Sequence, residues 1–179
     1  MIHEIDLEGH STPQMEFVLQ VFLKQPNSVV LFTGGGLVPP KLTKLDGLSF
    51  LHVHPGYLPF VKGADGLLWS MLLRGRPGAS AFFMAPGIDE GDLLLTAEFE
   101  PLKFLLAPDE LPDTQDMYRM VFSFYDPIVR AALLCDLIDK SPDLATLVGQ
   151  PQDLKDGRTF HFMSERMRIE ALSAIFERH

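Results

Sequence analysis

The chain has 179 residues, of which 46% are hydrophobic, so it is long enough to form one domain with a well-packed core. Its formal net charge of −9 argues against a general affinity for nucleic-acid backbone or for anionic membranes. A single cysteine, Cys135, excludes an internal disulfide framework. The sequence has neither a signal-peptide pattern nor an apolar run long enough to span a bilayer, and we therefore expect a cytoplasmic protein.

The first predicted elements alternate between strand and helix. Residues 2–7 alternate apolar and polar side chains, as a short half-buried strand would, and helical spacing follows from Pro13 to Leu23. Residues 28–33 are apolar on both faces, which predicts a strand buried in a parallel sheet. The glycines at 34–36 then form a turn with neither a P-loop lysine nor the dinucleotide-binding spacing.

Residues 49–54 predict a strand that delivers two histidines to a turn. Alternate side chains of a strand share a face, so His52 and His54 point the same way. Pro55 stops regular pairing and Gly56 lets the backbone turn, which places both imidazoles at the end of the strand. Open α/β sheets keep their functional sites at this end.

One more helix and two more strands complete the predicted sheet and its cover. Residues 67–73 predict an apolar helix of about two turns, which the glycines and proline of residues 74–78 end. Residues 79–84 and 93–99 read as buried strands. The fold class is therefore α/β, with a mostly parallel sheet and flanking helices.

The segment from Asp113 predicts helix. Its apolar residues follow alternating steps of four and three, which indicates one face packed on the core. They are Met117, Val121, Phe124, Ile128, Ala131, Cys135 and Ile138. Pro127 either kinks this helix or begins a second one. Residues 159–162 predict a short strand and residues 165–178 a closing helix, so we expect one domain over residues 1–179 with a helical part from 113 to 179.

One acidic residue completes a candidate site. Asp89 lies in a glycine-flanked loop 35 residues after His54, and we expect His52, His54 and Asp89 to converge. Histidine with a supporting carboxylate suits acid–base catalysis. Two histidines and an aspartate also suit a metal site with an open position, as in a metal-dependent hydrolase. Hydrogen-bonded histidines in an ordinary loop are the third reading, and spacing alone leaves all three open.

The surrounding motifs resemble the catalytic core of the folate-dependent formyltransferases, a family that includes the methionyl-tRNA, glycinamide ribonucleotide and sugar N-formyltransferases. The matching residues are 54–59 (HPGYLP), 62–65 (KGAD) and 87–94 (GIDEGDLL). The family pattern is Asn-x-His-Pro-Ser-x-Leu-Pro, then a basic residue with glycine, then Asp-x-Gly-Asp before a strand. The resemblance runs from residue 29 to residue 99 and, more loosely, through residues 157–162 (GRTFHF).

The resemblance implies a Rossmann-like fold and transfer of a formyl group from 10-formyltetrahydrofolate to a primary amine. His54 would be the catalytic histidine and Asp89 the catalytic aspartate, with no metal required. The acceptor would be a small molecule, such as an amino sugar nucleotide or an amino-acid derivative. The residues implied for the folate pocket are Met84, Gly87, Ile88, Glu90 and Asp92.

Two departures from the family pattern affect the site. His52 stands where the family has asparagine, whose amide donates a hydrogen bond to the oxyanion without ionising. A neutral imidazole donates from only one of its nitrogens, so His52 either replaces the asparagine, changes the chemistry or marks an inactive binding module. Gly56 stands where the family has serine, and we expect it to widen the turn.

A third departure concerns the N-terminal half. Only 27 residues precede the strand at residue 28, which is room for one βα unit instead of the usual run of strands and helices. We therefore expect a shortened N-terminal half. An uncovered sheet edge or helix face favours self-association, and we expect a homodimer.

Overall fold

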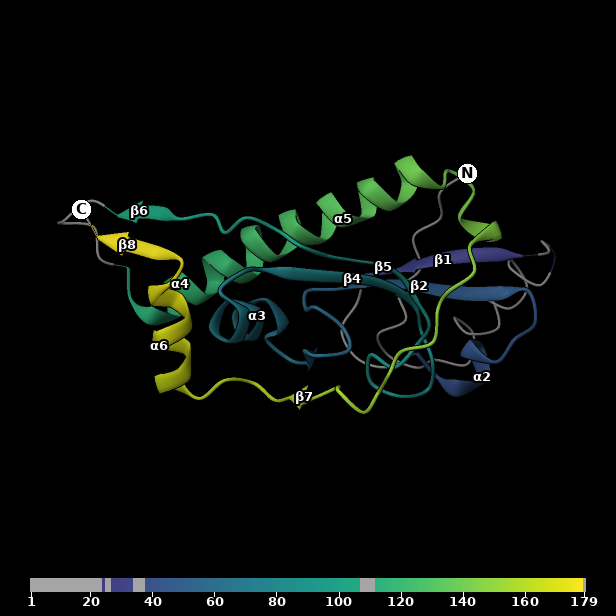
Figure 1. Ribbon diagram of the computed structural model, residues 1–179, viewed down its shortest axis with the longest axis horizontal. Coiled ribbons are helices and arrows are strands. Elements are labelled where there is room, and N and C mark those ends of the chain that lie inside the picture. The colour runs from purple at the N-terminus through teal and green to yellow at the C-terminus, as the bar shows by residue number, and fades with distance from the viewer. Residues whose placement is uncertain (1–23, 25–26, 34–37, 107–111, 179) are drawn as a thin grey trace.

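The computed structural model describes residues 24, 27–33, 38–106 and 112–178 (Figure 1). The predicted strand at 2–7, the helix from Pro13 to Leu23 and the glycine turn at 34–36 lie outside the described residues. The strands are β1 Ser28–Phe32, β2 Leu48–His54, β3 Lys62–Gly63, β4 Gly78–Phe83, β5 Leu93–Glu98, β6 Phe104–Leu106, β7 Thr159–Phe160 and β8 Phe176–Arg178. The helices are α2 Pro40–Thr43, α3 Gly66–Arg74, α4 Thr114–Met120, α5 Asp126–Lys140 and α6 Glu165–Ser173, with a π-helical turn over Val121–Tyr125 and a 3₁₀ turn over Leu144–Thr146.

The main sheet has four described strands in the order β1-β2-β4-β5. β1 and β2 pair in parallel, whereas β2 with β4 and β4 with β5 pair antiparallel. The α/β class is confirmed, but the four described strands form a mixed sheet, with one parallel and two antiparallel pairings where a mostly parallel sheet was predicted. The cause is that an apolar run on both faces reports burial of a strand and carries no information about its direction.

The alternation of β2 separates two apolar clusters. Leu51 and Val53 lie in the main core, which α5 covers where it packs along β2, β4 and β5 (Figure 1). Phe50 and Leu48 point to the other face, where they pack with Val38 and Leu42. His52 and His54 have the same parity as Phe50, so they lie on the face opposite the main core.

The helix from residue 114 to residue 140 is continuous, but its buried face differs from the predicted one. The buried residues follow steps of four, at Val121, Tyr125, Val129, Leu133 and Leu137. Phe124 and Ile128, predicted to be buried, are 65% and 55% exposed. The π-helical turn ends at Tyr125, two residues before Pro127, and shifts the register of the helix. Proline has no N–H for the α-helical ladder, which explains why the irregular turn precedes it.

The C-terminal segment ends as a strand instead of a helix. β7 pairs in parallel with β3, which confirms the short strand predicted near residue 159. α6 ends at Ser173, and β8 then pairs in parallel with β6. Ile175 and Phe176 are buried, and the Phe176 ring stacks on Phe104 with centroids 5.4 Å apart. Helical spacing alone could not show that Phe176 joins a strand pair and that Ile175 lies in the turn before it. Among the described residues, no helix is both long enough and apolar enough to cross a membrane.

Candidate active site

His54 is the best-enclosed side chain of the site. It is 3% exposed at the end of β2, and both ring nitrogens face protein groups. Nε2 lies 3.0 Å from the carbonyl oxygen of Val61, and Nδ1 lies 3.5 Å from Oδ2 of Asp89. A carbonyl oxygen only accepts hydrogen bonds, so Nε2 is the nitrogen that carries a proton. His54 is therefore fixed from both sides.

Asp89 is brought to His54 by its backbone. It adopts a left-handed conformation, with φ of 52°, in the turn between β4 and β5. Its Oδ2 also accepts a hydrogen bond of 2.8 Å from the backbone N–H of Gly63. Gly63 has φ of 91°, and a side-chain carbon there would lie 2.2 Å from the Phe160 carbonyl oxygen, so the position requires glycine. The sequence prediction that His54 and Asp89 converge is confirmed as a contact; their catalytic roles remain a prediction.

His52 is half-buried on the same face of β2, two residues before His54 at the end of the strand. Its Nδ1 lies 2.8 Å from the backbone carbonyl oxygen of Phe32 on β1. The ring also contacts the rings of Phe32 and Phe82, with centroids 5.9 and 5.7 Å away. Neighbouring strands thus hold the imidazole, and Nε2 has no hydrogen-bond partner within the described part of the chain.

The charges around the two histidines act in opposite directions on their protonation. Burial lowers the pKa of His52 and of His54, because a charged imidazolium loses its hydration. The Asp89 carboxylate opposes this and raises the pKa of both rings, whereas Arg130 on α5 lowers both. Asp126, which is paired with Arg130 at 2.6 Å, raises the pKa of His52. The neutral form of each ring is favoured by burial.

The turn after His54 is tight. A side-chain carbon at Gly56 would lie 2.6 Å from Nε2 of His54 and 2.6 Å from the Val61 carbonyl oxygen. The expectation that Gly56 widens the turn is therefore wrong, since glycine here lets the imidazole ring and the turn approach each other. Ser80 on β4 holds the same turn, because its hydroxyl accepts from the Leu58 N–H at 2.9 Å and donates to the Gly56 carbonyl at 2.7 Å.

The loop predicted to line a folate pocket follows β4. The Met84 N–H donates to the Phe50 carbonyl at 2.8 Å, and the Asp92 carbonyl accepts from the Phe83 N–H at 3.0 Å. Gly87 packs against the Glu90 carboxylate, and Ile88 is 48% exposed. These residues lie in one loop beside Asp89. Their contact with folate remains a prediction.

A buried lysine supports this loop from β3. Lys62 is 5% exposed, and its Nζ lies 3.0 Å from Oε1 of Glu90. A buried ammonium is stable only with a partner, so Glu90 is held toward β3 while Gly63 holds the neighbouring Asp89. The basic residue and glycine of the KGAD motif therefore each bind one of the two adjacent acidic residues.

Gln152 is a site residue that sequence reasoning missed. Its Nε2 donates to the carbonyl oxygens of Asp89, at 2.9 Å, and Gly91, at 2.6 Å. The Leu93–Gln150 backbone bridge lies beside it. The amide thus fixes the backbone on both sides of Glu90. No local pattern could have identified Gln152, because its partners are backbone groups 61 and 63 residues away.

The metal-site reading is not supported by the arrangement of side chains. Each histidine has one nitrogen directed at a backbone carbonyl, and the second nitrogen of His54 faces Asp89. Within the described ranges, no group of three or more histidine, cysteine, aspartate or glutamate residues is arranged to hold a metal ion. His52, His54 and Asp89 therefore do not form the three-ligand site that spacing alone left open.

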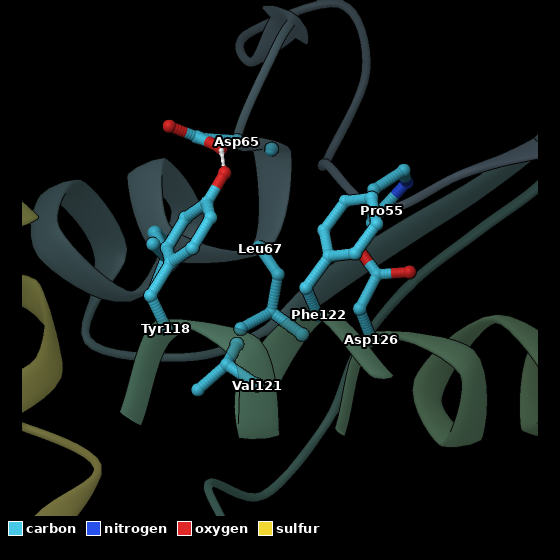
Figure 2. A pocket seen from close by; sticks show the side chains of 9 residues that line it. Pro55, Asp65, Leu67, Tyr118, Val121, Phe122 and Asp126 are labelled. Carbon is cyan, nitrogen blue, oxygen red and sulfur yellow. Dashed lines mark hydrogen bonds between the residues drawn. The ribbon is translucent and has the colours of Figure 1, made fainter. Parts of the chain in front are cut away.

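A shallow pocket adjoins the site beyond Pro55, the residue after His54 (Figure 2). It lies between the start of α3 and the junction of α4 with the π-helical turn, with Leu67, Val121 and Phe122 among its lining residues. Two carboxyl groups also line it, but both are engaged. Asp65 accepts from the Tyr118 hydroxyl at 2.7 Å and from the Met163 N–H at 2.8 Å. The pocket therefore offers mainly apolar contact.

Comparison with known proteins agrees with this geometry. The chain is 27% identical over 85 residues to methionyl-tRNA formyltransferase from Clostridioides difficile, covering 46% of the chain and 27% of the relative. It is 33% identical over 75 residues to the same enzyme from Syntrophus aciditrophicus, covering 41% of the chain and 24% of the relative. The resemblance to formyltransferases is confirmed. The aligned part spans about a quarter of the length of these curated relatives.

The fold is also that of a formyltransferase. The solved structure of methionyl-tRNA formyltransferase from Clostridium thermocellum superposes with a TM-score of 0.56 at 16% identity, covering 95% of this chain and 68% of that one. At this identity the match establishes the Rossmann-like formyltransferase fold and no more. No protein-family model matches the chain.

Proposed function

We propose that the protein transfers a formyl group from 10-formyltetrahydrofolate to a primary amine. The observation that supports this best is the contact between His54 and Asp89 at the end of β2, 3.5 Å apart, in a chain with a formyltransferase fold. The two residues are also those that the family motif assigns to the reaction. The relatives named above are methionyl-tRNA formyltransferases, and the chemistry proposed here is likewise transfer of a formyl group.

A small acceptor suits this chain better than a tRNA. Its formal net charge is −9, and nucleic-acid binding draws on clusters of lysine and arginine that neutralise phosphates. We therefore propose an amino sugar nucleotide or an amino-acid derivative as the acceptor. Competition by such amines against a tRNA acceptor in a formyl-transfer assay distinguishes the two classes.

The chemistry needs no group beyond the side chains of the site. The amine attacks the formyl carbon, and negative charge develops on the formyl oxygen before N10 of the folate leaves. Correct placement of the two reactants supplies much of the rate enhancement. Asp89, held by Gly63 and beside His54, fixes the orientation of the imidazole and adds negative charge to the site in which a proton moves from the amine to N10.

The folate would lie against the loop after β4. We expect main-chain groups of the loop around Gly87 and Ile88 to hydrogen-bond the planar ring, because the Met84 N–H already donates to Phe50. The Lys62–Glu90 pair and the Gln152 amide hold this loop in one conformation. A preorganised loop loses less conformational entropy when it binds a ligand.

Calorimetry with 5-formyltetrahydrofolate, a stable mimic of the donor, tests the proposal before the acceptor is known. We expect one site per chain, with binding weakened in Gln152→Leu and unchanged in Gln150→Leu, whose side chain is exposed. Absence of binding contradicts the proposal.

Two outcomes separate an enzyme from the alternative, an inactive formyltransferase-like binding module. Folate binding with formyl transfer to at least one amine supports the enzyme. Folate binding with no transfer to any amine, unaltered in His54→Ala, supports the binding module. The predicted homodimer and cytoplasmic location are separate expectations, which sedimentation equilibrium and cell fractionation test.

A further inference from the structure

The two histidines of β2 differ in what they can offer a substrate. Both nitrogens of His54 face protein groups, the Val61 carbonyl and the Asp89 carboxylate, and the side chain is 3% exposed. His52 is half-buried, and among the described residues only its Nδ1 has a hydrogen-bond partner, the Phe32 carbonyl at 2.8 Å. The remaining nitrogen, Nε2 of His52, is therefore the imidazole atom of this site that a substrate can meet.

The hydrogen bond to Phe32 also determines which proton His52 carries. A carbonyl oxygen only accepts, so the bond requires a proton on Nδ1. A neutral imidazole has a single N–H, and its Nε2 then holds a lone pair. Neutral His52 consequently presents an acceptor where an asparagine amide would present a donor. It cannot replace the asparagine of the family pattern as a donor to the oxyanion.

We propose that Nε2 of His52 accepts the proton of the attacking amine and returns it to N10 of the folate. This inference rests on the proposed function and assigns the proton transfer to His52, with His54 as a positioning residue that holds Asp89.

The proton balance closes without another reactant. The neutral amine nitrogen forms a bond to the formyl carbon and gives one proton to Nε2. The bond from the formyl carbon to N10 then breaks, its electron pair moves to N10, and N10 takes the proton from Nε2. His52 begins and ends neutral, and the products are the formamide and tetrahydrofolate. While protonated, its Nε2–H is also a donor for the charged formyl oxygen.

The groups around His52 suit an exchange of this kind. Asp89 and Asp126 favour its protonated form, and Arg130 and burial disfavour it. His54, two residues along the same strand face, is electrostatically linked to it and disfavours simultaneous protonation of both rings. Burial lowers the pKa of His52, so the ring is neutral and able to accept a proton, and the two carboxylates stabilise the protonated form once the proton has moved.

The substitution His52→Asn distinguishes a base from an oxyanion donor, because asparagine is the residue of the family pattern. If His52 accepts the proton, kcat falls by about 10²-fold or more. The fall in the wild-type kcat at acid pH, where His52 becomes protonated, also disappears. If His52 is an oxyanion donor, His52→Asn is as active as the wild type or more so, and the proposal is overturned. His161→Asn is the matched control, because His161 is exposed and its backbone carbonyl, not its ring, accepts the hydrogen bond from Trp69.

A spectroscopic measurement tests the same assignment in the unmodified protein. The ring ¹⁵N shifts of His52 at neutral pH should show a protonated Nδ1 and an unprotonated Nε2. A proton on Nε2 in the neutral ring overturns the proposal, whether or not the His52→Asn variant folds.

Failure of this inference is distinguishable from failure of the proposed function. Without binding of 5-formyltetrahydrofolate in calorimetry, the proposed function fails. With folate binding and formyl transfer that His52→Asn leaves unchanged, only the role of His52 fails. With folate binding but no transfer to any amine, the base role is also overturned, because there is no proton transfer to assign.

Discussion

The end of β2 and the helix from residue 114 to residue 140 are held in place in different ways. Around β2 the side chains are fixed by backbone groups, such as the Val61 carbonyl for His54 and the Gly63 N–H for Asp89. The helix is held by apolar packing along one face, at Val129, Leu133 and Leu137. Directional bonds fix individual atoms, whereas packing depends only on which face is turned inward. A small shift in register therefore changes which side chains of the helix are buried, whereas it has less effect on the hydrogen-bonded atoms of the site.

The largest expected effect tests the helix. Leu133 is fully buried, so Leu133→Ala should cost about 2–5 kcal/mol of unfolding free energy. Phe124 is 65% exposed, and Phe124→Ala should change stability by less than about 0.5 kcal/mol. Urea denaturation of both variants gives the two values. A larger loss for Phe124→Ala would restore the face predicted from the sequence and remove the contrast between the two regions.

The second prediction concerns the backbone beside Asp89. Gly63→Ala should destabilise the protein by about 1–3 kcal/mol, because it adds strain at φ of 91° and a clash with the Phe160 carbonyl. Gly75→Ala is the control, since Gly75 has φ of 69° but no atom within 4 Å of the added carbon. The difference between the two losses of unfolding free energy measures the cost of the clash at the close contact between β3 and β7. Equal losses would show that this approach contributes nothing.

The third prediction concerns Gln152, whose replacement by leucine should lower the unfolding free energy by about 1 kcal/mol. Gln152→Leu removes the hydrogen bonds to the Asp89 and Gly91 carbonyls, and we expect formyl transfer to slow about tenfold as Asp89 loses its fixed position. Steady-state kinetics should show the loss mainly in kcat. Gln150→Leu should behave as the wild type, and an equal loss in that variant would argue against a specific role for the Gln152 amide.

The smallest expected effect is the pH dependence of stability. His52 and His54 both have a lowered pKa in the folded protein, so below pH 6.5 the unfolded chain binds more protons than the folded one. Unfolding free energy should therefore be highest above pH 6.5 and fall as the pH is lowered from 7 to 5. Urea denaturation across this range should give a shallower slope for His52→Asn than for His161→Asn. Identical slopes would mean that the burial of His52 does not oppose its protonation.

Local patterns in the sequence predicted much of the β2 region. Strand alternation placed His52 and His54 on one face, and the family motif brought Asp89 to His54, where the structure has it. The tautomer of His52 could not be predicted, because it depends on a backbone carbonyl of β1. Every residue has such a carbonyl, so the sequence does not mark the one that contacts the ring. Ser80 and Gln152 were missed for the same reason, since their partners are backbone atoms distant in sequence.

Periodicity predicted the helices better than their faces. The pattern from Asp113 indicated a long helix, and the structure has one, but the π-helical turn before Pro127 lies between the residues used to choose the face. Strand direction escaped prediction as well, because burial on both faces of β4 is the same in parallel and antiparallel neighbours. Direction and rotation are set by connections and by register, which composition does not encode.

The Gln152 amide has a consequence for the order of folding. Asp89 belongs to a turn between neighbouring antiparallel strands, which can form early because their contacts are local. The two bonds that fix its backbone come from a residue 63 positions later. During synthesis on the ribosome, the β4–β5 hairpin can therefore exist for seconds before its loop acquires the final conformation. Competence to bind ligand should appear as a late kinetic event, after the main sheet has formed.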